Sequence, residues 1–445
     1  MRTLRNYRQK RGTKLKVKVV GAGLAGSEAA YQLLKRGAEV ELVEMRPEKF
    51  TPAHKTAGFA ELVCSNSLKS MDPDTSSGAL KTELAALDSL ILRCAYGAKV
   101  EAGGALAVDR AKFSAAVEKE LRSFPNLTVT TKEEVELSDE MPVIYATGPL
   151  TSDKLCDSIF QKNGKDLHFF DAIAPIVDKN SIDMSKAFCG GRYNKGGDDY
   201  LNLPMNKEEY LAFYDALISA KTVELKDFEG TEVFEGCMPI EVMAKRGADT
   251  MRFGPLKPVG LFGPNGEKYY AVVQLRKETS EGAAFNMVGF QTNLTYGEQK
   301  RVFGMIPALK EAEFLRYGVM HRNTYLDSPR VLDETFKLKS SKNIYFAGQI
   351  TGVEGYMESA MSGLLAAIFL YREQMGLQKV LPSESTVCGA LTNYIAHSSD
   401  KNFQPMNSNF GILPDITVRD KKLRKKLYAE RSKNDIQVFA DIVNV

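Results

Sequence analysis

Two of the six cysteines lie among polar and charged residues rather than on apolar stripes. Cys64 is flanked by serine and asparagine in the stretch ELVCSNSL. Cys237 follows a glycine in FEGCMPIEVMAKR, with Lys245 and Arg246 shortly after it. Nearby cations lower the pKa of a thiol and favour the thiolate, which is the nucleophilic form. Both cysteines are therefore candidate reagents, with an exposed but unreactive thiol as the alternative for each.

The remaining cysteines are widely scattered, and the chain contains no CxxC pair. This spacing argues against a zinc site and against a disulfide-stabilised secreted domain, so we predict no metal. In a reducing compartment a thiol is by default a packing residue, and we expect most of the other four to be buried. These are Cys94, Cys156, Cys189 and Cys388.

The composition of the 445-residue chain is ordinary for a globular protein, with 44% hydrophobic and 26% charged residues. No window approaches the roughly 18 uncharged apolar residues that a membrane-spanning helix needs. The basic N-terminus, residues 1–16, lacks a signal-peptide core and is either a disordered tail or an arm that touches RNA. We expect a cytoplasmic protein. The net charge of +3 is too small to indicate a nucleic-acid binder by itself.

The elements that would position reactive groups begin with a glycine-rich turn. Val17–Val20 is a short β-branched run, typical of a strand buried in a parallel sheet. Gly21, Gly23 and Gly26 follow in the spacing GxGxxG. In such a turn the first glycine permits the tight bend, the second lets a pyrophosphate approach the backbone, and the third lets helix and strand pack closely.

The residues after the glycines complete a dinucleotide-binding unit. Leu24–Lys35 is predicted to be helical, so its N-terminal N–H groups point toward the phosphates. The next strand ends at Glu44, where a carboxylate accepts hydrogen bonds from ribose hydroxyls. An acid there disfavours a 2′-phosphate, so FAD or NAD fits better than NADP. The alternative is a glycine-rich turn that binds no ligand. That alternative does not explain why an acid stands at position 44.

A late strand and helix favour FAD over NAD. Asn343–Gly376 contains an apolar strand, a glycine-rich turn and a long helix with small residues, as in flavoproteins that close their FAD site late in the chain. Met141–Leu150 resembles the strand and ATG turn of the same folds. We therefore predict an α/β fold, a Rossmann-like FAD-binding domain with an inserted smaller α+β domain. The domains would be 1–166 with 330–445, and 167–329.

Helical periodicity appears in two further segments. Residues 77–96 have apolar positions at helical spacing, and Cys94 follows that face, so we predict one helix with Cys94 in the core. From Arg419 to Lys433 there are eight Lys or Arg and two acids. Leu423 and Leu427 are spaced to anchor this segment as a helix. Its basic face is then either merely solvated or a phosphate-binding surface.

Longer motifs carry a more specific resemblance. They are EMRPEKFTPAHKTAGFAELVCSNSLKS, EAGGALAVDR, FEGCMPIEVMAKRGADTMRFGPLKPVGL, FAGQITGVEGYMESAMSGLLAA and NFQPMNSNFGILP. Together with the glycine-rich turn they resemble, in order from Val17 to Pro414, the folate- and FAD-dependent tRNA (uracil-5-)-methyltransferase family. That family is related to the GidA/MnmG flavoproteins.

The resemblance implies methylation of C5 of the T-loop uridine of tRNA. It implies FAD as cofactor, with 5,10-methylenetetrahydrofolate as carbon donor and NAD(P)H as the source of electrons. The implied partners are tRNA, through its T-arm, and the small-molecule folate and nicotinamide, with no membrane and no DNA.

The resemblance also implies roles for individual residues. Cys237 matches the family nucleophile, and Cys64 matches a second cysteine near the flavin. Tyr356 would line the folate pocket. His54 is either a pocket residue or a structural histidine, and Arg110 either a pocket cation or a structural ion-pair partner. The implied cofactor contacts are Gly21, Ala22, Gly23, Gly26, Glu44, Met45, Arg46, Gly348, Gln349, Gly352, Glu354, Gly355 and Tyr356.

Four alternatives remain at this point. The same chemistry could act on a ribosomal uridine, or the chain could modify the tRNA wobble uridine, although it is much shorter than such enzymes. A flavin-dependent redox enzyme for a small molecule would be favoured by a CxxC near the flavin, which is lacking. An FAD-bound RNA chaperone would keep its activity without Cys237.

Overall fold

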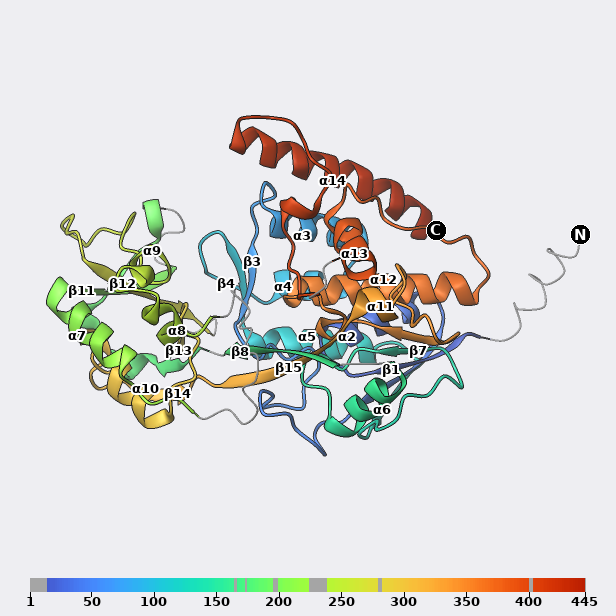
Figure 1. The fold of residues 1–445 in the computed structure, drawn as a ribbon, viewed down its shortest axis with the longest axis horizontal. Helices are drawn as coiled ribbons and strands as arrows, with labels where there is room; N and C mark the ends of the chain where they lie inside the picture. The colour runs from blue at the N-terminus through green and yellow to red at the C-terminus, as the bar shows by residue number, and fades with distance from the viewer. Residues whose placement is uncertain are drawn as a thin grey trace, which may run out of the picture.

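A computed structural model of the chain gives its fold (Figure 1). The structure describes residues 14–163, 166–172, 174–194, 199–223, 238–278, 282–399 and 403–444. The basic tail up to residue 13 and the segment 224–237, which contains Cys237, lie outside the described residues. Within the described part, no helix combines the length and the apolar character needed to cross a membrane.

Five parallel strands form the central sheet of the larger part of the molecule, in the order β16-β7-β1-β2-β6. They are β1 (Lys16–Val20), β2 (Glu39–Glu44), β6 (Leu127–Thr131), β7 (Val143–Tyr145) and β16 (Ile344–Phe346). The early glycine-rich unit, the ATG strand and the late strand thus meet in one sheet. This confirms the predicted Rossmann-like α/β fold.

Helices cover both faces of this sheet, as buried parallel strands require. On one face α2 (Leu24–Lys35) packs against α12 (Tyr356–Gln374), and Gly363 of α12 crosses the α2 backbone closely, since an added Cβ would lie 2.1 Å from Ala25 O. On the other face α6 (Asp153–Asn163) packs against the apolar side chains that alternate to that side.

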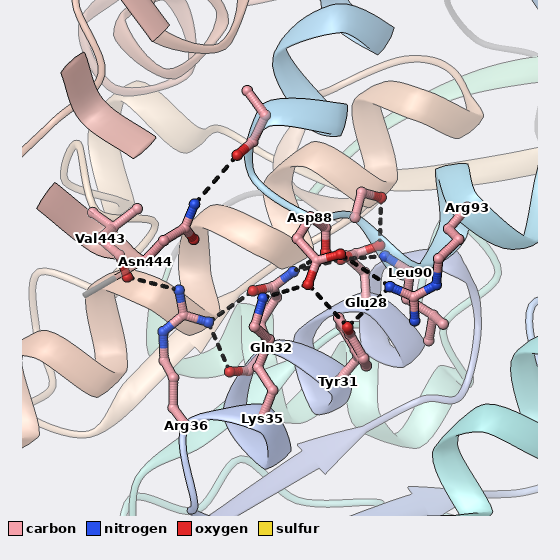
Figure 2. Close-up of polar contacts among 12 residues, drawn as sticks. Glu28, Tyr31, Gln32, Lys35, Arg36, Asp88, Leu90, Arg93, Val443 and Asn444 are labelled. Atoms are coloured by element: carbon pink, nitrogen blue, oxygen red, sulfur yellow. Dashed lines mark hydrogen bonds and ion pairs between the residues drawn. The ribbon is translucent and has the colours of Figure 1, made fainter. Parts of the chain in front are cut away.

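The segment predicted as one helix over 77–96 forms two helices, α3 (Ser76–Ala86) and α4 (Leu90–Gly97), so that prediction is wrong. Asp88 has a φ of +55°, and the Ser89 side chain caps α4 by accepting from Leu92 N. Figure 2 shows the carboxylate of Glu28, on α2, at the same helix start, where it accepts from Leu90 N at 3.2 Å. The apolar period runs through the break, because both helices pack on the same core.

Asp88 also ties this turn to the exposed end of α2. Its carboxylate accepts from Lys35 Nζ at 2.6 Å and from Arg93 at 3.0 Å, and Tyr31 Oη lies 3.0 Å away. In Figure 2 the neighbouring Arg36 reaches the C-terminal end of the chain, with a bond of 3.1 Å to the carbonyl of residue 443. The turn at Asp88 and the end of α14 (Lys421–Val443) therefore both bond to the C-terminal end of α2.

A second sheet, with its own apolar core, occupies the left-hand part of Figure 1. Its strand order is β10-β11-β12-β13-β9-β14, with antiparallel neighbours. The strands are β9 (Ile176–Asp178), β10 (Phe188–Cys189), β11 (Tyr200–Met205), β12 (Ala271–Lys277), β13 (Ala284–Met287) and β14 (Phe314–Arg316). Its helices are α7 (Lys207–Ile218), α8 (Ile240–Lys245), α9 (Thr250–Phe253) and α10 (Tyr296–Phe303).

An antiparallel pair, β8 (Asp166–Ala172) and β15 (Met320–Leu326), leads out to this second sheet and back. The boundaries at 167 and 329 stay a prediction. The other elements are β3 (Ser67–Ser70), β4 (Lys99–Val100), β5 (Ala105–Val108), α5 (Arg110–Arg122), α11 (Ser328–Val331), α13 (Val387–His397) and α14 (Lys421–Val443). The short 3-10 helices are η2 (Lys179–Ser181), η3 (Met184–Lys186), η4 (Arg192–Asn194), η6 (Pro307–Leu309), η7 (Gln349–Thr351) and η8 (Phe410–Ile412).

Helix α14 forms as predicted, but not on the predicted anchor. Leu423 is 47% exposed, and the first buried residue of the helix is Tyr428. Deeper in the helix, Ser432 donates to the buried Glu83 carboxylate, which also accepts from the amides of Val387 and Cys388 at the start of α13. The predicted anchor was wrong because the buried residues of the helix, from Tyr428 to Val443, all follow the two leucines.

The four cysteines expected to be mostly buried differ from one another. Cys388 is buried, Cys94 and Cys156 are partly buried, and Cys189 is exposed, so the expectation is wrong for the set. Cys94 does pack against the main core, and burial raises its thiol pKa to about 11. It is therefore a protonated packing residue at neutral pH.

Candidate active site

The three glycines after β1 have different surroundings. Gly21 has a φ of +97° and lies against the Ala146 backbone, so a side chain there would be strained and crowded. A Cβ added at Gly26 would lie 1.8 Å from Gly21 O, whereas one added at Gly23 would meet no atom within 4 Å. The first and third glycines therefore permit close packing, and the second leaves open space above the backbone.

Glu44, the last residue of β2, is buried beside this turn. Its Oε2 accepts from Ala22 N at 2.8 Å, and its Oε1 accepts from Arg46 Nε at 2.9 Å. Burial alone would raise the pKa of Glu44, but the hydrogen bonds and charge of Arg46 outweigh it, and the net pKa is lowered. Arg46 is itself buried and also pairs with Glu61 at 3.1 Å. The carboxylate is ionised and fixed in orientation.

A first cavity opens at the carboxyl ends of β1, β2, β7 and β16. We refer to it as the glycine-lined cavity. Among the predicted cofactor contacts, it is lined by Gly21, Gly23, Glu44, Met45, Arg46, Gly348, Gln349 and Tyr356. Ligands of open α/β sheets bind at this edge. Five members of the predicted set do not line it. Ala22 binds Glu44 through its N–H, Gly26 packs on the Gly21 backbone, and Gly352 lies against the Phe403 ring. Glu354 and Gly355 line a second cavity.

His54 also lines the glycine-lined cavity. Its Nδ1 lies 2.6 Å from Thr51 Oγ1. Burial, followed by the nearby Arg46 charge, lowers the pKa of His54 to about 4. The ring is therefore neutral at pH 7 and has a structural hydrogen bond while it faces the cavity, so both sequence interpretations hold in part.

A second cavity adjoins the first and contains Cys64; we refer to it as the cysteine cavity. It is lined by Ala53, Val63, Cys64, Ser65, Ser67, Leu68, Lys69, Pro149, Leu150, Asn323, Gln349, Glu354, Gly355, Tyr356, Met357 and Glu358. Gln349 and Tyr356 line both cavities. A molecule in one cavity is thus in reach of a molecule in the other.

Tyr356 holds the Cys64 loop. The backbone N–H groups of Cys64 and Ser65 donate to Tyr356 Oη at 2.8 and 3.0 Å. Burial first, and then the Cys64 thiol, raise the pKa of Tyr356 above its usual value, so the phenol stays neutral. The hydroxyl at the N-terminus of α12 therefore fixes the position of the cysteine backbone.

Two buried polar atoms on the wall of the cysteine cavity have no partner among the described residues: Glu358 Oε2 and Asn323 Nδ2. Glu358 Oε1 is bound by Lys69 Nζ at 3.0 Å and Ser408 Oγ at 2.7 Å. Burial alone would raise the pKa of Glu358, but Lys69 and Ser408 lower it. Buried polar atoms are normally satisfied, so an acceptor and a donor remain for a bound molecule.

Two arginines hold the Cys64 loop from the other side. Arg276, on β12 of the second sheet, donates to Ser65 Oγ and to Asn66 Oδ1, both at 2.8 Å. Arg110 pairs with Glu278 at 2.8 Å and donates to the carbonyl of residue 62 at 2.7 Å. Of the two roles considered for Arg110, the structure thus supports the structural ion pair. The Cys64 loop is therefore fixed by one residue of the second sheet, Arg276, and by Arg110 at the start of α5.

Cys237, the predicted nucleophile, lies outside the described residues, so its distance from Cys64 is not part of this geometry. The chain after it is described from residue 238, and α8 follows at once. Within the described ranges, no group of three His, Cys, Asp or Glu side chains is placed to hold a metal ion.

Comparisons with known proteins identify the family of the chain. Residues 16–378 match the family "Glucose inhibited division protein A". A protein of Acetivibrio thermocellus named methylenetetrahydrofolate–tRNA-(uracil-5-)-methyltransferase TrmFO is 55% identical over 96% of this chain and 98% of its own length. The chain belongs to the TrmFO family. TrmFO proteins of Listeria monocytogenes and Streptococcus thermophilus are 54% and 53% identical over 96% of the chain, and over 99% and 98% of their own lengths.

The fold of this TrmFO-family chain also resembles solved structures of Aquifex aeolicus GidA. The form II crystal structure superposes with a TM-score of 0.70 at 14% identity, covering 96% of this chain and 74% of GidA. The form I structure gives 0.67 at 15% identity, covering 97% and 78%. At this identity the likeness concerns the fold alone.

Several residues of the TrmFO-family site carried no signal that we used. Asn323 and Arg276 lie outside the motifs that carry the resemblance. Glu61 lies in the same motif as Arg46, but its pairing with Arg46 was not predicted. Glu358 could have been found, because a carboxylate in the first turn of the late helix, just after the glycine-rich turn, points toward the cofactor edge.

Proposed function

We propose that this TrmFO-family chain methylates C5 of the T-loop uridine of tRNA. The carbon comes from 5,10-methylenetetrahydrofolate, and FAD reduced by NAD(P)H supplies the electrons. The observation that carries the proposal is the similarity of more than 50% identity, over nearly the full chain, to proteins named for this reaction. The two adjoining cavities, which share Tyr356, support it because the reaction needs a cofactor and a folate side by side.

The glycine-lined cavity fits FAD. The open space above Gly23 is where a pyrophosphate would approach the backbone, and Glu44 is held at the strand end where ribose hydroxyls are bound. When bound, FAD supplies the reducing equivalents that convert the transferred methylene group into methyl. We further propose Gly21, Met45, Arg46, Gly348 and Gln349 as contacts, and residues 167–329 as the inserted domain.

The cysteine cavity fits the folate and the uracil. The free oxygen of Glu358 and the free amide nitrogen of Asn323 suit a flat heterocycle that offers a donor and an acceptor. Cys237 is proposed to add as thiolate to C6 of uracil, which makes C5 enolate-like and nucleophilic. After C5 has gained the carbon and lost its proton, the thiolate leaves again. Cys64 acts beside it, as a base or in handling the methylene group.

The test uses unmodified tRNA transcript, FAD, NADPH and methylenetetrahydrofolate labelled in its methylene carbon. Label in 5-methyluridine is measured by nucleoside mass spectrometry. Wild-type protein should label the tRNA, whereas Cys237→Ala and a T-loop U→C tRNA should give none. Cys189→Ala, which removes an exposed thiol on β10, is the matched control and should retain activity.

If label is absent from tRNA but present in ribosomal RNA, the proposed reaction stands and the proposed substrate is wrong. Absence of label in both RNAs, from protein that holds FAD and oxidises NADPH, would contradict the methyltransferase proposal. Activity retained by Cys237→Ala would contradict the nucleophile assignment alone.

A further inference from the structure

The first two turns of α14 carry a dense group of cations, which we refer to as the basic turns. Their members are Lys421, Lys422, Arg424, Lys425 and Lys426. None of the seven residues from 421 to 427 is buried, so the basic turns project beyond the part of the helix that packs on the protein. Figure 1 shows α14 along the upper edge, with its N-terminal end on the side of the second sheet.

The charges of the basic turns oppose helix stability. A helix N-terminus favours acids, yet the first turn of α14 has none inside the helix. Lys421 and Lys425 are four positions apart, as are Lys422 and Lys426, and like charges at that spacing repel each other. Among the described residues, two carboxylates lie next to the group: Asp420 caps the helix by accepting from the N–H groups of Lys422 and Leu423, and Glu430 lies 3.7 Å from Lys426. Two carboxylates beside five cations leave most of the positive charge of the basic turns uncompensated.

The rest of α14 fixes the basic turns on a segment that also contacts the wall of the cysteine cavity. The ring of Tyr428 stacks on Phe410 at 5.2 Å between ring centroids, and Tyr428 Oη bonds to Asp415 at 3.0 Å. Two residues before Phe410, Ser408 bonds to Glu358 in the wall of the cysteine cavity. One short segment thus connects the cavity wall to the base of the basic turns.

We propose that the basic turns of α14 bind the phosphate backbone of the tRNA while its uridine occupies the cysteine cavity. This inference rests on the proposed function. Phosphates neutralise closely spaced lysines without a need for base-specific contacts, so the surface contributes affinity and orientation rather than sequence choice. A uridine that reacts in a cavity must first leave the stack of its loop, and the phosphates of the adjoining stem then remain outside for the lysine side chains to bind.

The experiment compares two variants that each lose four exposed lysines. The test variant is Lys421→Gln, Lys422→Gln, Lys425→Gln and Lys426→Gln; glutamine has nearly the helix propensity of lysine. The matched control is Lys119→Gln, Lys339→Gln, Lys342→Gln and Lys379→Gln, four exposed lysines close to the amino ends of β6 and β16 or to the C-terminal end of α12, opposite the cavities. Binding of unmodified tRNA transcript is measured across a salt series, together with FAD content and KM and kcat.

The magnitude of the slope of log Kobs against log[salt] should fall by about 2 to 4 in the test variant, because each phosphate that is no longer neutralised removes roughly 0.7 to 0.9. At a fixed moderate salt concentration its tRNA affinity should fall at least about tenfold, with a matching rise in KM for tRNA and unchanged kcat and FAD content. The control variant should change the slope by less than about 1.

Equal slopes for the two variants would overturn the inference, even if the protein methylates tRNA. A loss of self-association or of vesicle binding, with tRNA affinity intact, would also overturn it and assign the surface to another protein or a membrane. If the salt slope changes as expected but the wild-type protein makes no 5-methyluridine, the basic turns still bind tRNA phosphates and the proposed function is refuted instead.

Discussion

Substituting Gly23 or Gly26 by alanine should separate cofactor binding from folding. Both changes add one methyl group within the same glycine-rich turn. At Gly26 the new Cβ would lie 1.8 Å from a backbone oxygen, so helix α2 must move, and overpacking of this kind costs about 1 to 3 kcal/mol. At Gly23 nothing lies within 4 Å and the φ is −70°, so alanine fits without strain.

The assay measures urea unfolding of both variants without FAD, and then FAD affinity by flavin fluorescence. Gly26→Ala should lose about 1 to 3 kcal/mol of unfolding free energy, while Gly23→Ala should stay within about 0.5 kcal/mol of wild type. Gly23→Ala should nevertheless bind FAD at least about tenfold more weakly, which corresponds to about 1.4 kcal/mol. Wild-type FAD affinity in Gly23→Ala would refute the reasoning, because the open space would then not be where the cofactor approaches.

Three further predictions concern single side chains. Tyr356→Phe removes the acceptor for the Cys64 and Ser65 amides, so the methylation rate should fall at least about tenfold with FAD content unchanged; a normal rate would contradict this. His54 is neutral in the folded state down to about pH 4, whereas an unfolded histidine gains a proton below about pH 6.5, so stability falls as pH drops between these values. In His54→Gln, measured by urea unfolding, the fall in unfolding free energy between these pH values should be smaller than in wild type by up to about 3 kcal/mol. The same pH dependence in both proteins would contradict this prediction. Glu83→Ala leaves two buried amides of α13 without an acceptor and should cost about 2 to 4 kcal/mol while speeding hydrogen exchange in α14; a cost below about 1 kcal/mol would contradict it.

The sequence was most informative where one short segment determines its own structure. The spacing of Gly21, Gly23 and Gly26 between a β-branched run and a helix predicted the turn and its strand. The position of Glu44 could be predicted because it ends the strand that follows this helix, and ligands of such sheets bind at the carboxyl ends of the strands. The late strand was found for the same reason.

Contacts between distant segments were beyond sequence reasoning. The break at Asp88 was missed because the apolar period continues through it. Ser89 caps the second helix locally, but the Glu28 carboxylate that binds the same helix start comes from another helix. The exposure of Leu423 could not be read from spacing, since a helix of this composition has more than one face that could pack. Arg276, which holds the Cys64 loop, comes from a strand whose own pattern is that of an ordinary sheet core.

The hydrogen bonds from Arg276 to the Cys64 loop also determine when that loop becomes ordered during folding. Ser65 and Arg276 are 211 positions apart, so the loop leaves the ribosome long before its partner exists. Arg276 is in place only when β12 has paired with β11 and β13, and closing so long a loop is a late step. Cys64 is therefore made early and positioned late. A nascent or truncated chain can form the glycine-rich turn without yet presenting an organised thiol beside it.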